Sequence, residues 1–300
     1  MMRALSRILL RDGPLTVGIA PDWGGALSRF DVRRGDDLIP ILRPARDEPS
    51  QGPYALSASS FPLLPYCGRL RGGQFEFEGR SYQFPLNAAP ERHSSHGDGW
   101  TRPWCLTQLD RRSASMSLPA DPALPMPYAA VQRIDVQADR VRMSLSVSNA
   151  GRSRLPIGVG LHPYFAQRSL ARLRVELPWR WRWDQEYMPV ASEANPDWRA
   201  FVDGQAVDAL PVAAEYAQWN GRASIAWPTL GVEVGLRTHP PLKHVVLWVP
   251  QQQDFFCFEP TSHASDALHA QAGHPAAEDF IILEPQAVFE QHFDFNVAVG

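Results

Sequence analysis

Four residues with reactive or charged side chains stand at the ends of hydrophobic segments or in the loops beside them: Arg69 in PYCGRLRGG, His96 in HGDGW, His162 in GVGLHPYF and Glu259 in FFCFEP. A carboxylate can accept a proton and an imidazole can supply one near neutral pH, so Glu259 and His162 could act together as an acid and a base. Proline follows each of these two residues directly and fixes the direction in which the chain continues. The sequence therefore indicates a site where several strand ends meet.

Ordinary structural explanations exist for residues of these types. A histidine at the end of a strand is often a partly buried, hydrogen-bonded residue, and we interpret His93 and His263 as loop residues without a catalytic role. Glu284 ends the segment IILEP, which has the same local pattern as FFCFEP. Glutamate is almost never fully buried unless it is paired, so Glu259 after three aromatic residues is unusual. The pattern alone does not separate Glu259 from Glu284.

Sequence motifs for other chemistries are absent. The chain has no HExxH, no GxSxG, no phosphate-binding loop and no GxGxxG followed by a helix, so zinc protease, serine hydrolase and nucleotide-binding interpretations have no support. The three cysteines, Cys67, Cys105 and Cys257, are odd in number and lack CxxC spacing. This pattern favours reduced thiols over disulfides or a zinc site. We therefore expect neither a cofactor nor a metal.

Charge and hydropathy also restrict the partners. The chain has 29 Lys and Arg against 32 Asp and Glu, a formal charge of −3, which is unlike the basic excess of a nucleic-acid-binding or membrane-surface protein. No apolar stretch approaches the roughly 18 residues that a membrane span needs. The N-terminal segment is interrupted by arginines before an apolar export signal develops. We expect a cytoplasmic protein.

Alternation of polar and apolar residues recurs along the whole chain and predicts strands. The segments FEFEGRSYQF and IDVQADRVRMSLSV each contain two alternating runs about a short turn, which predicts two β-hairpins. We find no amphipathic helix of three turns, and residues 44–60, 91–103 and 184–215 are interpreted as irregular. The predicted class is all-β, a large antiparallel β-sandwich in a single domain over residues 1–300. The strands are predicted at residues 15–21, 26–32, 73–79, 81–86, 129–137, 140–149, 171–177, 231–237, 244–250, 255–260, 280–285 and 287–295.

Four of these segments, taken in order, resemble the aldose 1-epimerase or galactose mutarotase family. They are PYCGRLRGGQFEFEGRSYQFPLN, HSSHGDGW, GVGLHPYF and FFCFEPTSHASDALH, and the resemblance extends over roughly residues 15–295. In that family an Asn-Arg pair precedes a Gly-Gly hairpin, and a His-Gly loop, a His-Pro-Tyr-Phe segment and a glutamate near a strand end follow. Each element alone is weak, but four in order are fairly specific.

The resemblance implies a galactose mutarotase-like sandwich with an open cleft that interconverts the α and β anomers of a monosaccharide without a cofactor. It implies that Glu259 is the general base, that His162 is the general acid, and that His96 and Arg69 bind the sugar. Aromatic side chains near the cleft, such as Trp100 and Tyr164, could stack on the sugar. We expect a monomer or a homodimer.

Two departures from the family bear on the choice of sugar. Gly68 replaces the asparagine that usually precedes the arginine, and Ala213, Ala214 and Glu215 stand where a substrate-binding aspartate is expected. An alternating tryptophan trio favours core packing over a sugar-stacking platform: Trp179, Trp181 and Trp183.

Two alternative functions remain open at this stage. A hexose-6-phosphate 1-epimerase would use Arg69, Arg71 and Arg92 to hold the phosphate. A carbohydrate-binding protein without catalysis could use the same fold, because a fold does not imply a function.

Overall fold

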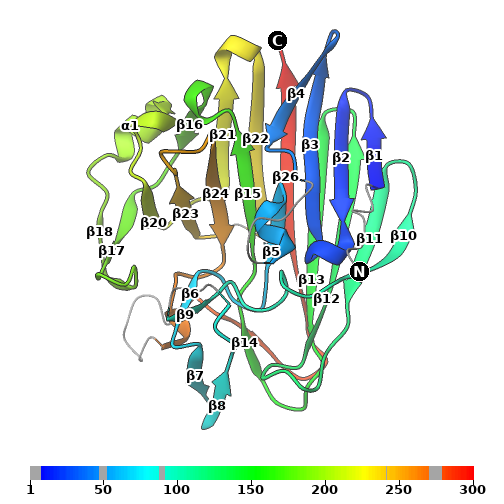
Figure 1. The fold of residues 1–300 in the computed structure, drawn as a ribbon. Coiled ribbons are helices and arrows are strands. Elements are labelled where there is room, and N and C mark those ends of the chain that lie inside the picture. Colours follow the sequence, from blue (N-terminus) through cyan, green and yellow to red (C-terminus); the bar gives the residue numbers. More distant parts are fainter. Residues whose placement is uncertain (1–7, 47–52, 88–91, 241, 270–278) are drawn as a thin grey trace.

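The computed structural model of the chain describes residues 8–46, 53–87, 92–240, 242–269 and 279–300, and two large antiparallel sheets dominate it (Figure 1). The larger sheet has eleven strands. Ten of them follow the order β1 (Ile8–Asp12), β2 (Leu15–Ala20), β3 (Ala26–Arg34), β4 (Asp37–Leu42), β15 (Gly160–Ala166), β24 (Phe255–Thr261), β23 (His244–Trp248), β20 (Ala213–Ala217), β17 (Trp179–Trp183) and β18 (Pro189–Ala194). The eleventh, β5 (Ser60–Leu63), pairs with β15 and β3.

The second sheet has nine strands, among them the longest in the described part of the chain. Its order is β10 (Cys105–Leu109), β11 (Ser113–Leu118), β12 (Tyr128–Gln137), β13 (Arg140–Asn149), β26 (Val288–Val299), β22 (Val232–His239), β21 (Arg222–Trp227), β16 (Arg172–Val175) and β19 (Gln205–Ala206). Three two-stranded sheets lie at one end: β14 (Leu155–Ile157) with β25 (Ile281–Leu283), β6 (Arg69–Arg71) with β9 (His93–Ser95), and β7 (Gln74–Phe77) with β8 (Arg80–Gln83).

These strands confirm the all-β prediction. Every segment predicted from alternation overlaps a strand, and β7–β8 and β12–β13 are the two predicted hairpins. The described residues contain one α-helix, α1 (Trp198–Asp203), which is shorter than three turns. Six single-turn 3₁₀ helices complete the described elements: η1 (Pro21–Trp23), η2 (Tyr54–Ser57), η3 (Arg168–Leu170), η4 (Val207–Ala209), η5 (Pro228–Leu230) and η6 (Ala267–His269).

The predicted irregular regions are partly wrong. Residues 184–215 contain β18, α1, β19, η4 and the start of β20, and residues 91–103 contain β9. Residues 44–60 contain η2 and the start of β5, while positions 47–52 and 91 lie outside the described residues. These strands are short or half-exposed, so their sequences lack a clear alternation of polar and apolar residues.

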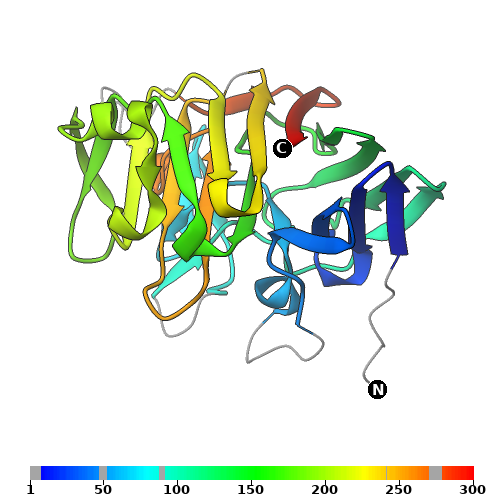
Figure 2. The same ribbon diagram turned by 90° about the horizontal axis from the view of Figure 1, so that it is seen from above.

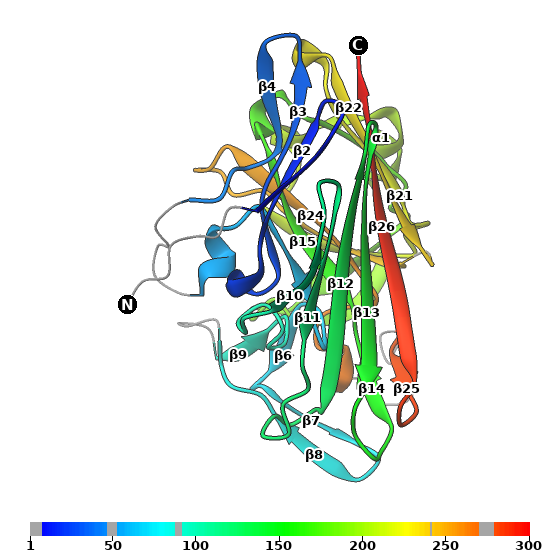
Figure 3. The same ribbon diagram turned by 90° about the vertical axis from the view of Figure 1, so that its right-hand side faces the viewer.

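The two large sheets form two layers with the main hydrophobic core between them. In Figure 3 the strands β12, β13 and β26 form one layer, and in Figure 2 the red β26 and yellow β22 are separated from the blue β1 and β2. Phe30 of β3 meets Phe295 of β26 edge to face, with ring centroids 5.9 Å apart. Contacts of this kind across the layers bury the apolar face of each sheet.

Strand β24 is buried on both faces, and its residues divide according to the period of a strand. Phe256 and Phe258 belong to the core between the sheets, whereas Phe255 and Cys257 pack in a second cluster on the opposite face. Alternation places Glu259 on the same face as Phe255 and Cys257. The glutamate therefore faces away from the main core.

Strand register brings His162 beside Glu259. The pairs Gly160↔Thr261 and Tyr164↔Cys257 between β15 and β24 place His162 level with Glu259. Opposite residues in an antiparallel pair point to the same face of the sheet. The pairing of the two central strands is thus what positions both candidate catalytic side chains.

Candidate active site

A cleft of about 350 Å³ lies on the face of the larger sheet that carries Glu259. It is lined by all four residues that the sequence singled out, Arg69, His96, His162 and Glu259. The other lining residues are Gly68, Ser95, Trp183, Tyr187, Val212, Ala213, Val246, Leu247, Trp248 and Ser265. A few convergent polar groups among aromatic and apolar side chains are typical of a small-molecule site.

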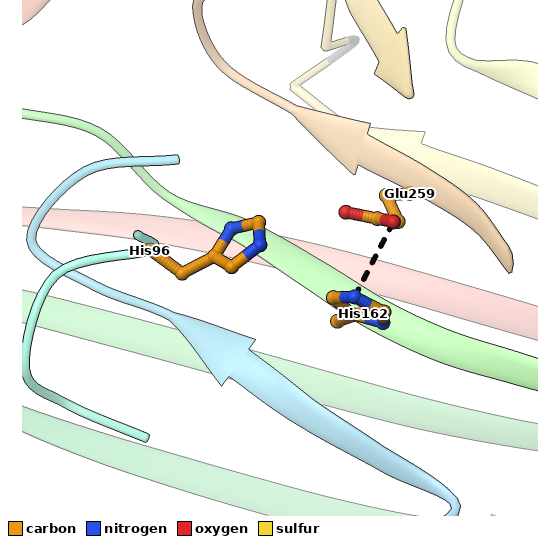
Figure 4. Close-up of side chains that lie close together, drawn as sticks. All are labelled: His96, His162 and Glu259. Atoms are coloured by element: carbon orange, nitrogen blue, oxygen red, sulfur yellow. Dashed lines mark ion pairs between the residues drawn. The ribbon is translucent and has the colours of Figure 1, made fainter. Parts of the chain in front are cut away.

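His162 and Glu259 both line this cleft. Their side chains face each other, as Figure 4 shows. The distance between His162 Nε2 and Glu259 Oε1 is 3.4 Å, and both side chains are almost completely buried. The second carboxylate oxygen of Glu259 and Nδ1 of His162 have no hydrogen-bond partner among the described protein atoms. Buried polar atoms without a partner are uncommon, and an incoming polar ligand could satisfy the carboxylate oxygen.

His96 and Arg69 reach the cleft from chain segments outside the large sheets. His96 follows β9 and has a positive φ of 58°, and its Nδ1 accepts a hydrogen bond of 3.1 Å from the backbone N–H of Gly68. The His96 ring points toward the His162–Glu259 pair (Figure 4). The Arg69 guanidinium lies 5.1 Å from the ring centre of Tyr187. The structure thus brings all four predicted residues together.

Burial dominates the electrostatics of the pair. Removal from water raises the pKa of Glu259 to about 8, with a further rise from the Glu215 carboxylate and an opposing effect from Arg69. Burial also lowers the pKa of His162 well below its ordinary value, and the nearby His96 and Arg43 act in the same direction. At neutral pH the pair therefore holds one proton, mainly on Glu259.

Glu215 is a site residue whose role the sequence did not indicate. It is fully buried on β20, opposite Val246 of β23, which in turn is opposite Glu259. Its carboxylate accepts hydrogen bonds from the backbone N–H of Ser265 at 2.7 Å and from Trp183 Nε1 at 3.2 Å. Glu215 therefore anchors two residues that line the cleft.

The glycine at position 68 is required by its surroundings. Its φ is +68°, and a Cβ built there would lie 2.1 Å from Ser265 Oγ. A side chain at this position would collide with the Ser265 hydroxyl unless that hydroxyl moved. The serine side chain therefore occupies space that a side chain at position 68 would need.

The structure separates the remaining candidates from the cleft. Glu284 is exposed and forms an ion pair with Arg154 at 3.1 Å, unlike Glu259. His263 is buried after β24, where its Nε2 accepts a hydrogen bond of 3.1 Å from the N–H of Cys67. His93 is not a loop residue as predicted but a buried residue of the short strand β9. None of these three side chains lines the cleft.

The aromatic residues proposed for sugar stacking differ from those that the structure places in the cleft. Trp100 and Tyr164 are buried and do not line it. Of the alternating tryptophans expected in the core, Trp181 packs in a buried cluster, whereas Trp179 is exposed. Trp183 packs against that cluster and also lines the cleft. A register shift of β17 against β18 at Trp183 accompanies this change of environment.

Three side chains of the cleft form a group that could hold a metal ion. The donor atoms of His96, His162 and Glu259 lie within 4.8 Å of one another. They are far apart in the sequence, so no spacing motif could reveal the group.

Comparisons with solved structures define the fold as galactose mutarotase-like. A crystal structure described as a candidate aldose 1-epimerase from Escherichia coli K12 matches with a TM-score of 0.86 and 28% identity, covering 99% of this chain and 100% of that one. An aldose epimerase homologue from Caenorhabditis elegans matches with a TM-score of 0.79 and 14% identity, covering 99% of each chain. The second likeness concerns the fold alone.

Sequence comparison then identifies the family. Residues 6–296 match the aldose 1-epimerase family. The uncharacterized Escherichia coli K12 protein YphB is 32% identical over 288 residues, which is 92% of this chain and 93% of that protein. The chain belongs to the aldose 1-epimerase family. No helix in the described part of the chain has the length and apolar character to cross a membrane.

Proposed function

We propose that the protein is an aldose 1-epimerase that interconverts the α and β anomers of a neutral hexose. The observation that carries the proposal is the 3.4 Å distance between Glu259 Oε1 and His162 Nε2 in a cleft that both residues line. The two oxygens of a hemiacetal are bonded to the same carbon, so a base for one and an acid for the other must stand side by side. The pair has this arrangement.

The reaction needs only a proton transfer at each oxygen. The reaction starts when the single proton of the pair passes from Glu259 to His162, across the 3.4 Å between Oε1 and Nε2. Glu259 then takes the proton of the C1 hydroxyl while His162 gives one to the ring oxygen, the bond between C1 and the ring oxygen breaks, and C1 becomes a carbonyl carbon. Rotation about the C1–C2 bond exposes the other carbonyl face. The reverse transfers close the ring and restore both side chains, so no oxidant or reductant is consumed.

Side chains around the pair provide groups for binding the sugar. Arg69 and His96 can hydrogen-bond to hydroxyls, and Trp183 offers an aromatic surface in the cleft. Ser265 takes the position that a side chain at residue 68 would occupy. We assign its hydroxyl as the replacement for the family's asparagine.

The charges of the site favour a neutral sugar over a sugar phosphate. The Arg71 guanidinium contacts three carboxylates, those of Glu186 at 2.9 Å, Asp266 at 3.2 Å and Asp184 at 3.3 Å. Arg92 does not line the cleft. Arg71 is therefore engaged by acidic groups that a phosphate would have to displace.

Polarimetry of a freshly dissolved pure anomer tests the proposal. Purified protein should speed the change in rotation in proportion to its concentration, whereas a binding protein without catalysis would leave the rate at its value in buffer. The acceleration should persist after treatment with EDTA. Loss of activity that a divalent cation restores would instead assign a metal to His96, His162 and Glu259.

A further inference from the structure

The imidazole of His162 packs against two aromatic rings, those of Phe61 and Tyr164, whose own centres are 6.2 Å apart. Its ring centre is 4.6 Å from that of Phe61 and 4.6 Å from that of Tyr164, with interplanar angles of 28° and 29°. Phe61 is the residue opposite His162 in the pairing of β5 with β15, and Tyr164 lies two residues further along β15. Register and strand period therefore place both rings on the same face as His162.

Each of the two rings also contacts a side chain other than His162. Trp100 stacks on Phe61 with ring centres 5.3 Å apart, and the Arg43 guanidinium lies 3.5 Å from the ring centre of Tyr164. Arg43 is fixed by hydrogen bonds to the carbonyl oxygens of Leu56 and Ala58, at 2.6 and 3.1 Å. Each of the two rings therefore contacts a second group in addition to the imidazole: Trp100 for Phe61 and Arg43 for Tyr164.

His162 lacks the hydrogen bond that commonly orients a catalytic histidine. A catalytic histidine is commonly oriented by a carboxylate or carbonyl group bonded to the ring nitrogen that does not react. Nδ1 of His162 has no such partner among the described protein atoms, while Nε2 faces Glu259. The ring contacts Phe61 and Tyr164 at small interplanar angles and His96 edge to face, with ring centres 5.4 Å apart.

We propose that Phe61 and Tyr164 are positioning residues that hold the His162 ring with Nε2 toward Glu259 and the sugar. The proposal rests on the catalytic function proposed above. Neither residue lines the cleft, so they act through His162 and not through the substrate. Their electron-rich faces also attract the imidazolium that forms when the ring carries a proton.

The kinetic test compares the loss of the aromatic ring with its conservative replacement. Tyr164→Leu and Phe61→Leu should each lower kcat at least tenfold, equivalent to about 1.4 kcal/mol, with KM changed less than twofold. Tyr164→Phe, which keeps the ring and removes the hydroxyl, should restore most of the rate. A rate near that of the wild type in both leucine variants would overturn the proposal.

A matched control is available in the β7–β8 hairpin, where Phe75 and Tyr82 stack with ring centres 4.7 Å apart. Tyr82→Leu removes a similar aromatic pair that is not part of the cleft, and it should leave kcat unchanged. If Tyr82→Leu lowered kcat as much as Tyr164→Leu, the effect would be a general loss of packing and the proposal would be wrong.

A measurement on the wild-type protein does not depend on activity or on the folding of the leucine variants. Ring currents from Phe61 and Tyr164 should shift the carbon-bound ring protons of His162 upfield in NMR spectra, with the signals assigned by their loss in His162→Asn. Signals at ordinary histidine positions would overturn the stacking. A shifted signal in a protein without mutarotase activity would refute the proposed function and leave the stacked geometry intact.

Discussion

Replacement of Glu259 by glutamine should remove activity and at the same time make the protein more stable. The substitution keeps the size and shape of a side chain that is 3% exposed. It removes the proton acceptor, and general base catalysis contributes about 10²–10⁴ in rate, or about 3–5 kcal/mol in the barrier. We therefore expect kcat for mutarotation to fall at least a hundredfold.

The gain in stability follows from the raised pKa of the buried carboxyl. The pKa is about 8 in the folded protein against an ordinary value of 4.5. Between these values the unfolded chain releases the proton and the folded chain keeps it, so stability falls as the pH rises through this range. At pH 7 the loss is about 3 kcal/mol, and it is absent below pH 4.5.

Glutamine does not ionise, so the variant does not lose this free energy of unfolding. Denaturant unfolding without sugar should show the variant about 3 kcal/mol more stable than the wild type at pH 7, with the difference disappearing toward pH 4.5. Glu284→Gln changes an exposed residue outside the cleft and should alter neither quantity. A Glu259→Gln variant with wild-type mutarotation, or with no pH-dependent gain in stability, would refute the reasoning.

Four further predictions concern the reaction. His162→Asn should lower kcat far more than it raises KM, because proton donation acts in the transition state, and initial-rate polarimetry over a range of sugar concentrations measures both. The rate should show a bell-shaped dependence on pH. Its upper limb should lie near pH 8, where the His162–Glu259 pair loses its last proton, and its lower limb well below pH 6.5, where the pair gains a second proton. Unperturbed side chains would instead give a lower limb from Glu259 and an upper limb from His162, and a rate that still rises above pH 9 would contradict the prediction. Ser265→Ala should raise KM several-fold with little change in kcat, and an unchanged KM would remove Ser265 from sugar binding. Neutral glucose or galactose should have a kcat/KM at least equal to that of glucose 6-phosphate, whereas a tenfold preference for the phosphate that falls with salt and with Arg71→Ala would contradict the assignment.

The central part of the site could be predicted from the sequence because it depends on strands with strong local signals. Phe255–Thr261 is a mostly apolar segment with a single acidic side chain, Glu259. Gly160–Ala166 is also mostly apolar and contains a single histidine, His162. Both are central strands, so the hydrophobic pattern that identifies the strand also places its polar residue. The single-domain organisation and the individual roles of the four site residues remain predictions.

The surroundings of the pair could not be predicted because they depend on contacts between distant segments. Glu215, Trp183 and Ser265 form one hydrogen-bonded group from three parts of the chain. Residues 184–215 lack the alternation that identifies strands, so neither β18 nor Tyr187 was recognised there. Alternation also could not show that Tyr164 contacts His162 and does not line the cleft.

The cleft draws its residues from two kinds of structure, and the division affects how such a protein can change. His162 and Glu259 stand on interior strands of an eleven-stranded sheet, where neighbours on both sides fix them. Arg69, His96 and Trp183 come from a short two-stranded sheet, the turn that follows it and a strand near the sheet edge. Under the proposed function, mutations in these outer segments would change which sugar is held while the geometry of the His162–Glu259 pair stays constant. Directed evolution toward a new sugar should therefore concentrate on the outer segments and leave the paired central strands unchanged.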